Sequence, residues 1–235
     1  MTVTASLVQT LHRINRQKTD LKGQLARGPK VVATATAKLT AAEKQAQDIR
    51  DEMKRMKMEA DSKQLQMKER EDKIHHWKGQ LNTVKENREF QTLKDQIAAD
   101  SQANVVLSDE ILEILEGLDT MEERLKQAEA NCVAVQDDRD KIAQQIAEKK
   151  VKLEEELARV EQELQEAESG LSGDFKRDYE RLVAAKGEEA MAELEGNCCS
   201  SCYKNLTPQL LEQLSTGQPV ICPSCGCLIY RVENG

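Results

Sequence analysis

Apolar residues recur at alternating spacings of three and four along most of this sequence, which is the pattern of helices that pack through a narrow seam. From residue 35 to residue 84, thirteen of fifteen such positions are apolar: Ala35, Leu39, Ala42, Ala46, Ile49, Met53, Met56, Ala60, Met67, Ile74, Trp77, Leu81 and Val84. Lys63 and Arg70 are the two exceptions. The same spacing extends upstream to Leu7. The pattern therefore predicts a long helix over residues 4–83.

A second stripe of the same kind begins at Phe90 and runs to Ile146, out of phase with the first. Fourteen of its seventeen positions are apolar, and the exceptions are Asp100, Asn104 and Arg139. A third phase then runs from Leu153 to Leu171, so a local change of supercoil is expected between residues 146 and 153. We expect a second long helix over residues 89–169.

The segment 82–89, between the two stripes, carries Asn and Thr residues that favour turns and helix ends. A bend there leaves two arms of similar length. The pattern therefore predicts an antiparallel coiled-coil helical hairpin within one chain, with its tip near 82–89. A parallel dimer of one continuous helix would not need such an interruption.

Gly28-Pro29 lies inside the first arm. Proline removes a backbone hydrogen bond and clashes with the preceding helical turn, so we expect a kink or a short break near 28–29. The pairing of the arms places this site opposite Ala143-Gln144, beside the phase shift of the second arm. The same pairing places residues near 60 opposite residues near 112.

The composition favours long helices rather than a large globular core. Of 235 residues, 32% are charged and only 3% are aromatic, and residues 30–207 contain no proline. No apolar run approaches the roughly 20 residues that span a bilayer. The first residues lack the basic start and apolar stretch of a secretory signal. These features argue against a membrane-spanning or secreted protein, and we expect a cytoplasmic one.

Charge is distributed unevenly between the arms. Residues 1–90 hold 19 Lys and Arg against 12 Asp and Glu, whereas residues 91–197 hold 13 against 28. Residues 198–235 hold two of each. Opposite net charges favour pairing across the seam, although two solvated faces that never meet would show the same counts. The net charge of −8 argues against a general nucleic-acid coat.

Six of the seven cysteines lie near the C-terminus, and four of them form a paired Cys-x-x-Cys pattern: Cys199, Cys202, Cys222 and Cys225. In a chain without a secretion signal, this spacing is typical of zinc rather than of disulfides. Four thiolates complete a tetrahedral shell, so we expect one structural Zn²⁺ with no open position for substrate. A redox-active dithiol is the alternative.

Three further cysteines need a role. Cys132 lies on the second stripe and is expected to be a small core residue. Cys198 and Cys227 each neighbour a predicted ligand, and we treat both as spare thiols, either of which could replace its neighbour in the metal shell.

The sequence around the cysteines predicts short strands at 190–194, 220–221 and 228–232, with a short helix over 208–215 that has Pro208 in its first position. This is the pattern of a small C4 zinc ribbon. The expected organisation is a hairpin over 1–172, a connecting helix and strand over 173–197, and a zinc ribbon over 198–235.

Two motifs resemble those of a known bacterial family with a coiled-coil hairpin and a C4-type zinc ribbon. Residues 87–97, Asn-Arg-Glu-Phe-Gln-Thr-Leu-Lys-Asp-Gln-Ile, are similar to the motif at the family's hairpin tip, with Phe90 in place of Tyr and Gln96 in place of Glu. The spacing from Cys199 to Tyr230 is similar to the family's ribbon, with Cys227 in place of Arg. The resemblance covers nearly the whole chain.

The resemblance implies an adaptor rather than an enzyme. Family members have been linked to protein partners in specialised secretion or flagellar assembly, to an alternative sigma factor, and in places to RNA. We expect protein partners to bind the coiled coil, and the exposed residues at its tip are the candidate contacts: Lys85, Arg88, Glu89 and Phe90. The alternative is an RNA-binding protein that acts through the ribbon. The pattern also allows a homodimer, and no catalytic motif is visible.

Overall fold

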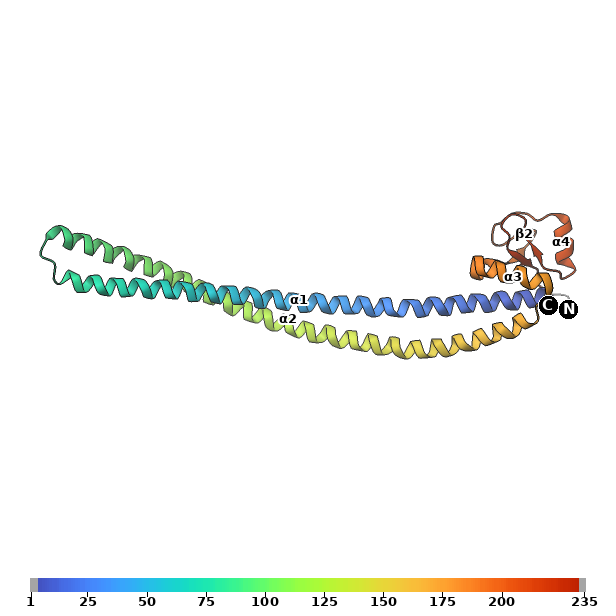
Figure 1. The fold of residues 1–235 in the computed structure, drawn as a ribbon, viewed down its shortest axis with the longest axis horizontal. Helices are drawn as coiled ribbons and strands as arrows, with labels where there is room; N and C mark the ends of the chain where they lie inside the picture. The colour runs from blue at the N-terminus through green and yellow to red at the C-terminus, as the bar shows by residue number, and fades with distance from the viewer. Residues whose placement is uncertain (1–3, 233–235) are drawn as a thin grey trace. The chain divides into compact units, whose positions relative to one another are not determined.

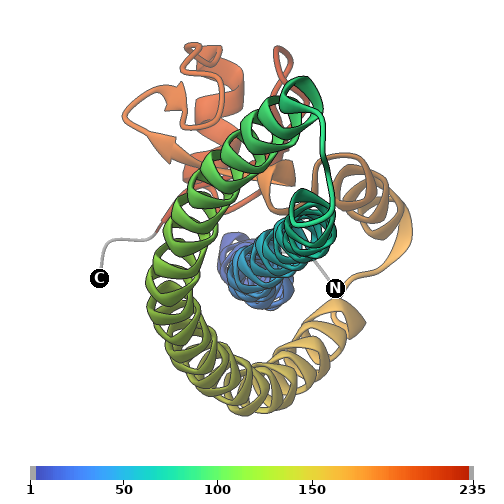
Figure 2. The ribbon, with the colours of Figure 1, turned by 90° about the vertical axis from the view of Figure 1, so that its left-hand side faces the viewer.

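The computed structural model describes residues 4–232, and it confirms a mainly helical chain that ends in a small sheet (Figure 1). Two long helices come first: α1 spans Ala5–Leu81, and α2 spans Asn87–Ser169. Residues 82–86 connect them, as the end-on view in Figure 2 shows. Each helix end lies within two residues of the end that the apolar pattern predicts.

Shorter elements follow the hairpin. In chain order they are α3 (Gly173–Lys186), a 3₁₀ turn η1 (Gly187–Ala190), β1 (Met191–Glu195), β2 (Cys198–Cys199), α4 (Pro208–Ser215), β3 (Val220–Ile221) and β4 (Leu228–Tyr230). The four strands form one sheet in the order β2-β1-β4-β3, in which β1 and β4 are parallel and the other pairs are antiparallel. The predicted short helix is confirmed, and the last strand ends at Tyr230, two residues before the predicted end.

The chain divides into two compact units. The middle unit is Thr34–Lys141, and the terminal unit combines Met1–Ala33 with Ile142–Gly235. The middle unit therefore contains the tip of the hairpin, and the terminal unit contains its base together with the sheet.

The middle unit is held together by the predicted seam. Its buried cluster contains side chains from both helices: Ala46, Ile49, Met53, Leu118 and Ala128. Cys132 packs against this cluster, as expected for a core residue. Gly117 allows a close approach, because a Cβ added there would lie 2.8 Å from the Cε of Met56. The two arms thus run antiparallel with their apolar stripes facing each other.

Polar residues that interrupt the two stripes contact the opposite arm. Arg70 Nη1 lies 3.2 Å from Asp100 Oδ1, and Lys63 Nζ lies 2.8 Å from Glu110 Oε2. The Nδ2 of Asn104 donates a hydrogen bond to the carbonyl oxygen of Met67 over 3.3 Å. A shift of one arm against the other would separate these pairs, so they fix the register of the seam.

The terminal unit has a core that joins the hairpin base to α3 and the sheet. Its buried side chains come from α1, α2, α3, β1 and β4, and they include Leu11, Ile14, Val160, Leu164, Tyr179, Met191, Leu228 and Tyr230. Burial across five elements means that the sheet and the hairpin base share one hydrophobic core.

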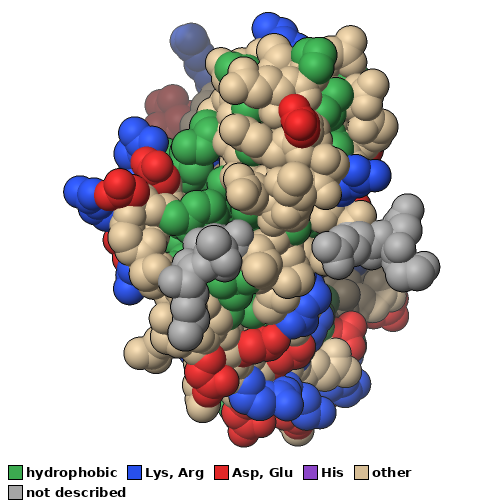
Figure 3. Space-filling model, turned by 90° about the vertical axis from the view of Figure 1, so that its right-hand side faces the viewer, with side chains coloured by type: hydrophobic (Ala, Val, Ile, Leu, Met, Phe, Trp, Pro, Cys, Tyr) green, Lys and Arg blue, Asp and Glu red, His purple; other side chains and the backbone are tan. Residues whose placement is uncertain are grey.

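The surface differs from this core. On the face that Figure 3 shows, acidic and basic side chains are interspersed.

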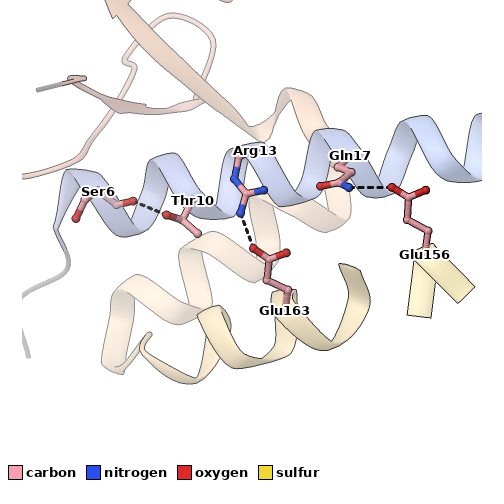
Figure 4. A network of polar contacts seen from close by, with 6 residues as sticks. All are labelled: Ser6, Thr10, Arg13, Gln17, Glu156 and Glu163. Atoms are coloured by element: carbon pink, nitrogen blue, oxygen red, sulfur yellow. Dashed lines mark hydrogen bonds and ion pairs between the residues drawn. The ribbon is translucent and has the colours of Figure 1, made fainter. Parts of the chain in front are cut away.

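Polar contacts reinforce this base. Arg13 forms an ion pair with Glu163, and Gln17 donates to Glu156 over 3.4 Å, so both contacts join α1 to α2 (Figure 4). Deeper in the core, the Nδ2 of Asn15 donates to the hydroxyl of Tyr179 over 3.0 Å. Burial raises the pKa of that hydroxyl, so Tyr179 remains a neutral donor and acceptor.

α1 continues through Pro29 without interruption, so no break occurs there, and the kink expected near Gly28-Pro29 stays a prediction. Pro29 is exposed, and its ring removes the helical donor of the carbonyl four residues earlier, at Leu25. Gly28 faces the other arm, and a Cβ added there would lie 3.0 Å from Cγ2 of Ile146. Ile146 is within one helical turn of the predicted partner. Packing against α2 therefore holds the helix intact at this site.

If the proline is tolerated rather than required, Pro29→Ala should stabilise the protein. The substitution restores a backbone hydrogen bond and should raise the free energy of unfolding by about 1 to 3 kcal/mol. Thermal unfolding followed by far-ultraviolet circular dichroism measures the change. The control Val31→Ala, at a neighbouring exposed position, should change stability by about 0.5 kcal/mol or less. A Pro29→Ala protein that unfolds at the same or a lower temperature would contradict this account of the site.

Candidate metal centre

The four cysteines of the paired pattern come together in the folded chain. The Sγ atoms of Cys199, Cys202, Cys222 and Cys225 all lie within 4.8 Å of one another. Sγ of Cys199 is 3.8 Å from Sγ of Cys225, and Sγ of Cys202 is 3.8 Å from Sγ of Cys222. Each close pair joins one Cys-x-x-Cys loop to the other. Two loops that are twenty residues apart in sequence thus form a single thiol cluster.

The two Cys-x-x-Cys loops have the same backbone geometry. The N–H of Tyr203 donates to the carbonyl of Cys199 over 2.7 Å, and the N–H of Gly226 donates to the carbonyl of Cys222 over 2.8 Å. Both donors adopt a positive φ, 58° at Tyr203 and 72° at Gly226. Glycine adopts this conformation without strain, as expected at position 226, whereas Tyr203 does so only because the turn requires it.

Backbone donors and burial set the acidity of the cluster. Burial raises the pKa of Cys199 to about 12. Backbone N–H groups of Cys202 and Ser201 favour its thiolate, but their effect is smaller than that of burial. At Cys222, burial acts in the same direction, but backbone N–H groups of Cys225 and Ser224, with the neighbouring thiols, lower the pKa to about 7. Within the cluster, Cys199 therefore favours its protonated form, and Cys222 is the more acidic thiol.

The cluster has dimensions that suit a tetrahedral metal ion. Four sulfurs at about 2.3 Å from a central ion are about 3.8 Å apart, which agrees with the two close pairs of the cluster. Within residues 4–232, it is the one group of Cys, His, Asp and Glu side chains placed to hold an ion. Four protein ligands would leave no position for water or substrate. The site could therefore support structure but not metal-based catalysis.

The two remaining cysteines of this region make other contacts. The thiol of Cys198 donates to Oδ1 of Asn205 over 2.9 Å. The thiol of Cys227 is buried and donates to the carbonyl of Glu189 over 3.1 Å. Each thiol uses its proton in a hydrogen bond within the chain, as expected for a spare thiol rather than a ligand.

Lys186, at the end of α3, is a residue near the cluster that the sequence did not suggest. Its ammonium group donates to the carbonyl of Cys225 and lies 3.5 Å from Sγ of Cys227. These contacts tie the end of α3 to the second Cys-x-x-Cys loop. No local motif marks Lys186, because it lies 39 positions before Cys225 in the sequence.

A second unanticipated contact joins the hairpin base to the sheet. Nδ1 of His12 lies 3.0 Å from the hydroxyl of Tyr230, and their rings meet edge to face. Burial, and then the charge of Arg16, lower the pKa of His12, so the imidazole favours its neutral form. The ring pair belongs to the packing of the terminal unit.

The candidate tip residues lie around the turn and all four are exposed. Arg88 and Glu89 line a shallow hollow together with residues of the turn and of both helix ends, whereas Lys85 and Phe90 lie outside its lining. Phe90 is 40% exposed. Val84 and Leu93, the neighbouring apolar positions of the two stripes, are partly buried.

No helix among residues 4–232 is long and apolar enough to cross a membrane. No curated protein matches the chain. The solved structures that share its fold include three at low sequence identity. CT398 from Chlamydia trachomatis is 19% identical with a TM-score of 0.82, over 97% of this chain and 98% of that one.

The second is the HP0958 protein from Helicobacter pylori, which is 13% identical with a TM-score of 0.66, over 98% of this chain and 99% of that one. The third is a protein from Mycobacterium smegmatis, which is 15% identical with a TM-score of 0.61, over 99% of this chain and 100% of that one. The likeness extends over both units of the chain.

The sequence profile of one family matches residues 4–187, which include both arms of the hairpin and α3. This match covers well over half of the chain, and it agrees with the antiparallel helices and the shared fold described above. The chain belongs to the family of the CT398-like coiled coil hairpin domain.

Proposed function

We propose that this protein is a non-enzymatic adaptor that binds protein partners through its coiled-coil hairpin. The observation that carries the proposal is the hairpin itself, since two helices of 77 and 83 residues expose side chains along their length. Extended helices recruit partners by offering further helical faces. The family match supports a scaffold of this kind.

The four-cysteine cluster fits this role as a structural zinc site. Zinc favours four thiolates in a tetrahedral arrangement, and it would stabilise a region that has few strands and a small core of its own. Reduced thiols are needed for such a site, which favours a cytoplasmic location. On this proposal the metal supports the fold at the base of the hairpin and takes no part in a reaction.

The tip is the proposed contact region for a partner. Arg88 and Glu89 offer charge of both signs beside a hollow, and Phe90 offers an exposed ring next to them. Exposed aromatic and arginine side chains contribute strongly to protein interfaces. Regulation of secretion, of flagellar assembly or of transcription is the kind of process in which such an adaptor would act.

Binding of RNA through the ribbon remains the second candidate from the sequence, but residues 198–235 hold only two basic residues against two acidic ones. Contacts to phosphate need a denser basic surface. Purification of the protein from lysate with and without nuclease separates the two functions, because protein partners persist after nuclease treatment and RNA-dependent partners do not.

The metal proposal predicts about one zinc ion per chain in the purified protein, and near zero in Cys199→Ser. Three ligands cannot complete the tetrahedral shell, so the sheet region should become sensitive to protease while the helical circular dichroism signal persists. Elemental analysis after gel filtration measures the metal. Cys198→Ser, at the adjacent spare thiol, should keep its zinc. One zinc per chain in Cys199→Ser, with the sheet still protected, would show that Cys198 is the ligand.

The tip proposal predicts that the double variant Arg88→Ala and Phe90→Ala loses partners that resist nuclease. These side chains are exposed, so their removal should leave the fold unchanged. Quantitative mass spectrometry of co-purified proteins measures the loss, which we expect to be about tenfold for a contact of this kind. Val133→Ala, at an exposed apolar position elsewhere on α2, is the control. If every partner stays bound to the double variant, the tip is not the contact region.

A further inference from the structure

One outer surface of α2 is unusual for a coiled coil, because it exposes apolar side chains away from the seam. Val105, Leu112 and Leu115 are 54%, 56% and 42% exposed. Outer positions of such helices are ordinarily polar. The seam already uses Leu107, Ile111 and Ile114, so these three exposed residues are surplus to it.

The same part of α2 contains acidic residues but no basic ones. Between Lys94 and Arg124 the chain carries nine Asp and Glu residues and no Lys, Arg or His. Two of the nine are used inside the hairpin, where Asp100 pairs with Arg70 and Glu110 pairs with Lys63. Among the residues that the structure describes, Asp109, Glu116 and Asp119 are exposed and form no ion pair.

These two features lie on one side of the helix. Val105, Asp109, Leu112, Glu116 and Asp119 follow one another at spacings of four and three, and Leu115 lies three residues after Leu112. Such spacings place side chains on adjoining turns of the same face. We call this surface the acidic apolar face, and it consists of Val105, Asp109, Leu112, Leu115, Glu116 and Asp119.

We propose that the acidic apolar face binds a basic amphipathic helix of a partner protein, which gives the adaptor function proposed above its partner chemistry. Apolar side chains of the partner would cover Leu112 and Leu115, and its Lys or Arg side chains would pair with Asp109, Glu116 and Asp119. Helices bind helical surfaces in this way through apolar residues that recur every three or four positions. Opposite charge at the edges speeds association and selects the partner.

A second copy of this chain fits the face less well. Two copies that met through this face would bring carboxylates against carboxylates, because residues 95–123 contain no basic residue. Like charges across an interface oppose association. The charge pattern therefore favours a basic partner over self-association.

A designed peptide tests the face directly. The probe is a fluorescein-labelled helix of about 18 residues with Leu at every third or fourth position and Lys elsewhere. Fluorescence anisotropy with the full-length protein at about 0.15 M salt measures its affinity. The same peptide with Glu in place of Lys is the charge control and should bind at least about tenfold more weakly.

Variants then locate the binding site. Leu112→Gln with Leu115→Gln should weaken binding of the Lys peptide by about tenfold or more, because both side chains are exposed and the fold does not need them. Asp109→Asn, Glu116→Gln and Asp119→Asn together should weaken binding and reduce its dependence on salt. Val133→Gln with Val151→Gln, at equally exposed positions of α2, is the matched control and should bind as the wild type does.

Three results would overturn the inference. The first is equal affinity for the Lys and Glu peptides, and the second is equal loss of binding in the control pair. The third is a concentration-dependent dimer that the Leu112 and Leu115 variant abolishes, because a second copy would then occupy the face. If peptide binding fails while nuclease-resistant partners persist, the adaptor proposal stands without this face. If the peptide binds as expected but no such partner exists, the adaptor proposal fails instead.

Discussion

Burial of one apolar stripe against another is the interaction on which this structure depends. Neither arm could bury its seam residues alone, and long isolated helices gain most of their stability from such packing. In the middle unit this burial forms one cluster from both helices. At the base, the same stripes also cover α3 and the strands β1 and β4, so the small sheet depends on the hairpin for part of its core.

Register is a separate requirement, and the polar residues of the seam meet it. Apolar side chains alone would allow one arm to slide by a heptad at little cost. The pairs Arg70–Asp100 and Lys63–Glu110 form only in the observed alignment. Residues that interrupt the pattern in sequence are thus the ones that select a single structure. The apolar residues of the acidic apolar face contribute to neither task, and beside the exposed carboxylates they point to a basic partner.

Much of the fold can be predicted from local sequence patterns. The features that cannot be predicted depend on contacts between residues far apart in the sequence. Spacing of three and four gave both helices, and the Cys-x-x-Cys repeats gave the thiol cluster, because each signal lies within a few neighbouring residues. Pro29 does not break α1, since packing against α2 keeps the helix whole. The contacts of Lys186 and His12 could not be predicted, because their partners lie 39 and 218 residues away.

Cysteine crosslinking across the seam tests the hairpin most directly. In the variant Lys63→Cys with Glu110→Cys, the two thiols replace an ion pair whose Nζ and Oε2 atoms are 2.8 Å apart. A short bis-maleimide crosslinker at dilute protein should therefore join the two thiols within one chain, and peptide mapping should recover a 63–110 crosslink from protein of monomer mass. Crosslinks formed only between chains would contradict an antiparallel hairpin within one chain, and with it the seam, the register and the surfaces that depend on them.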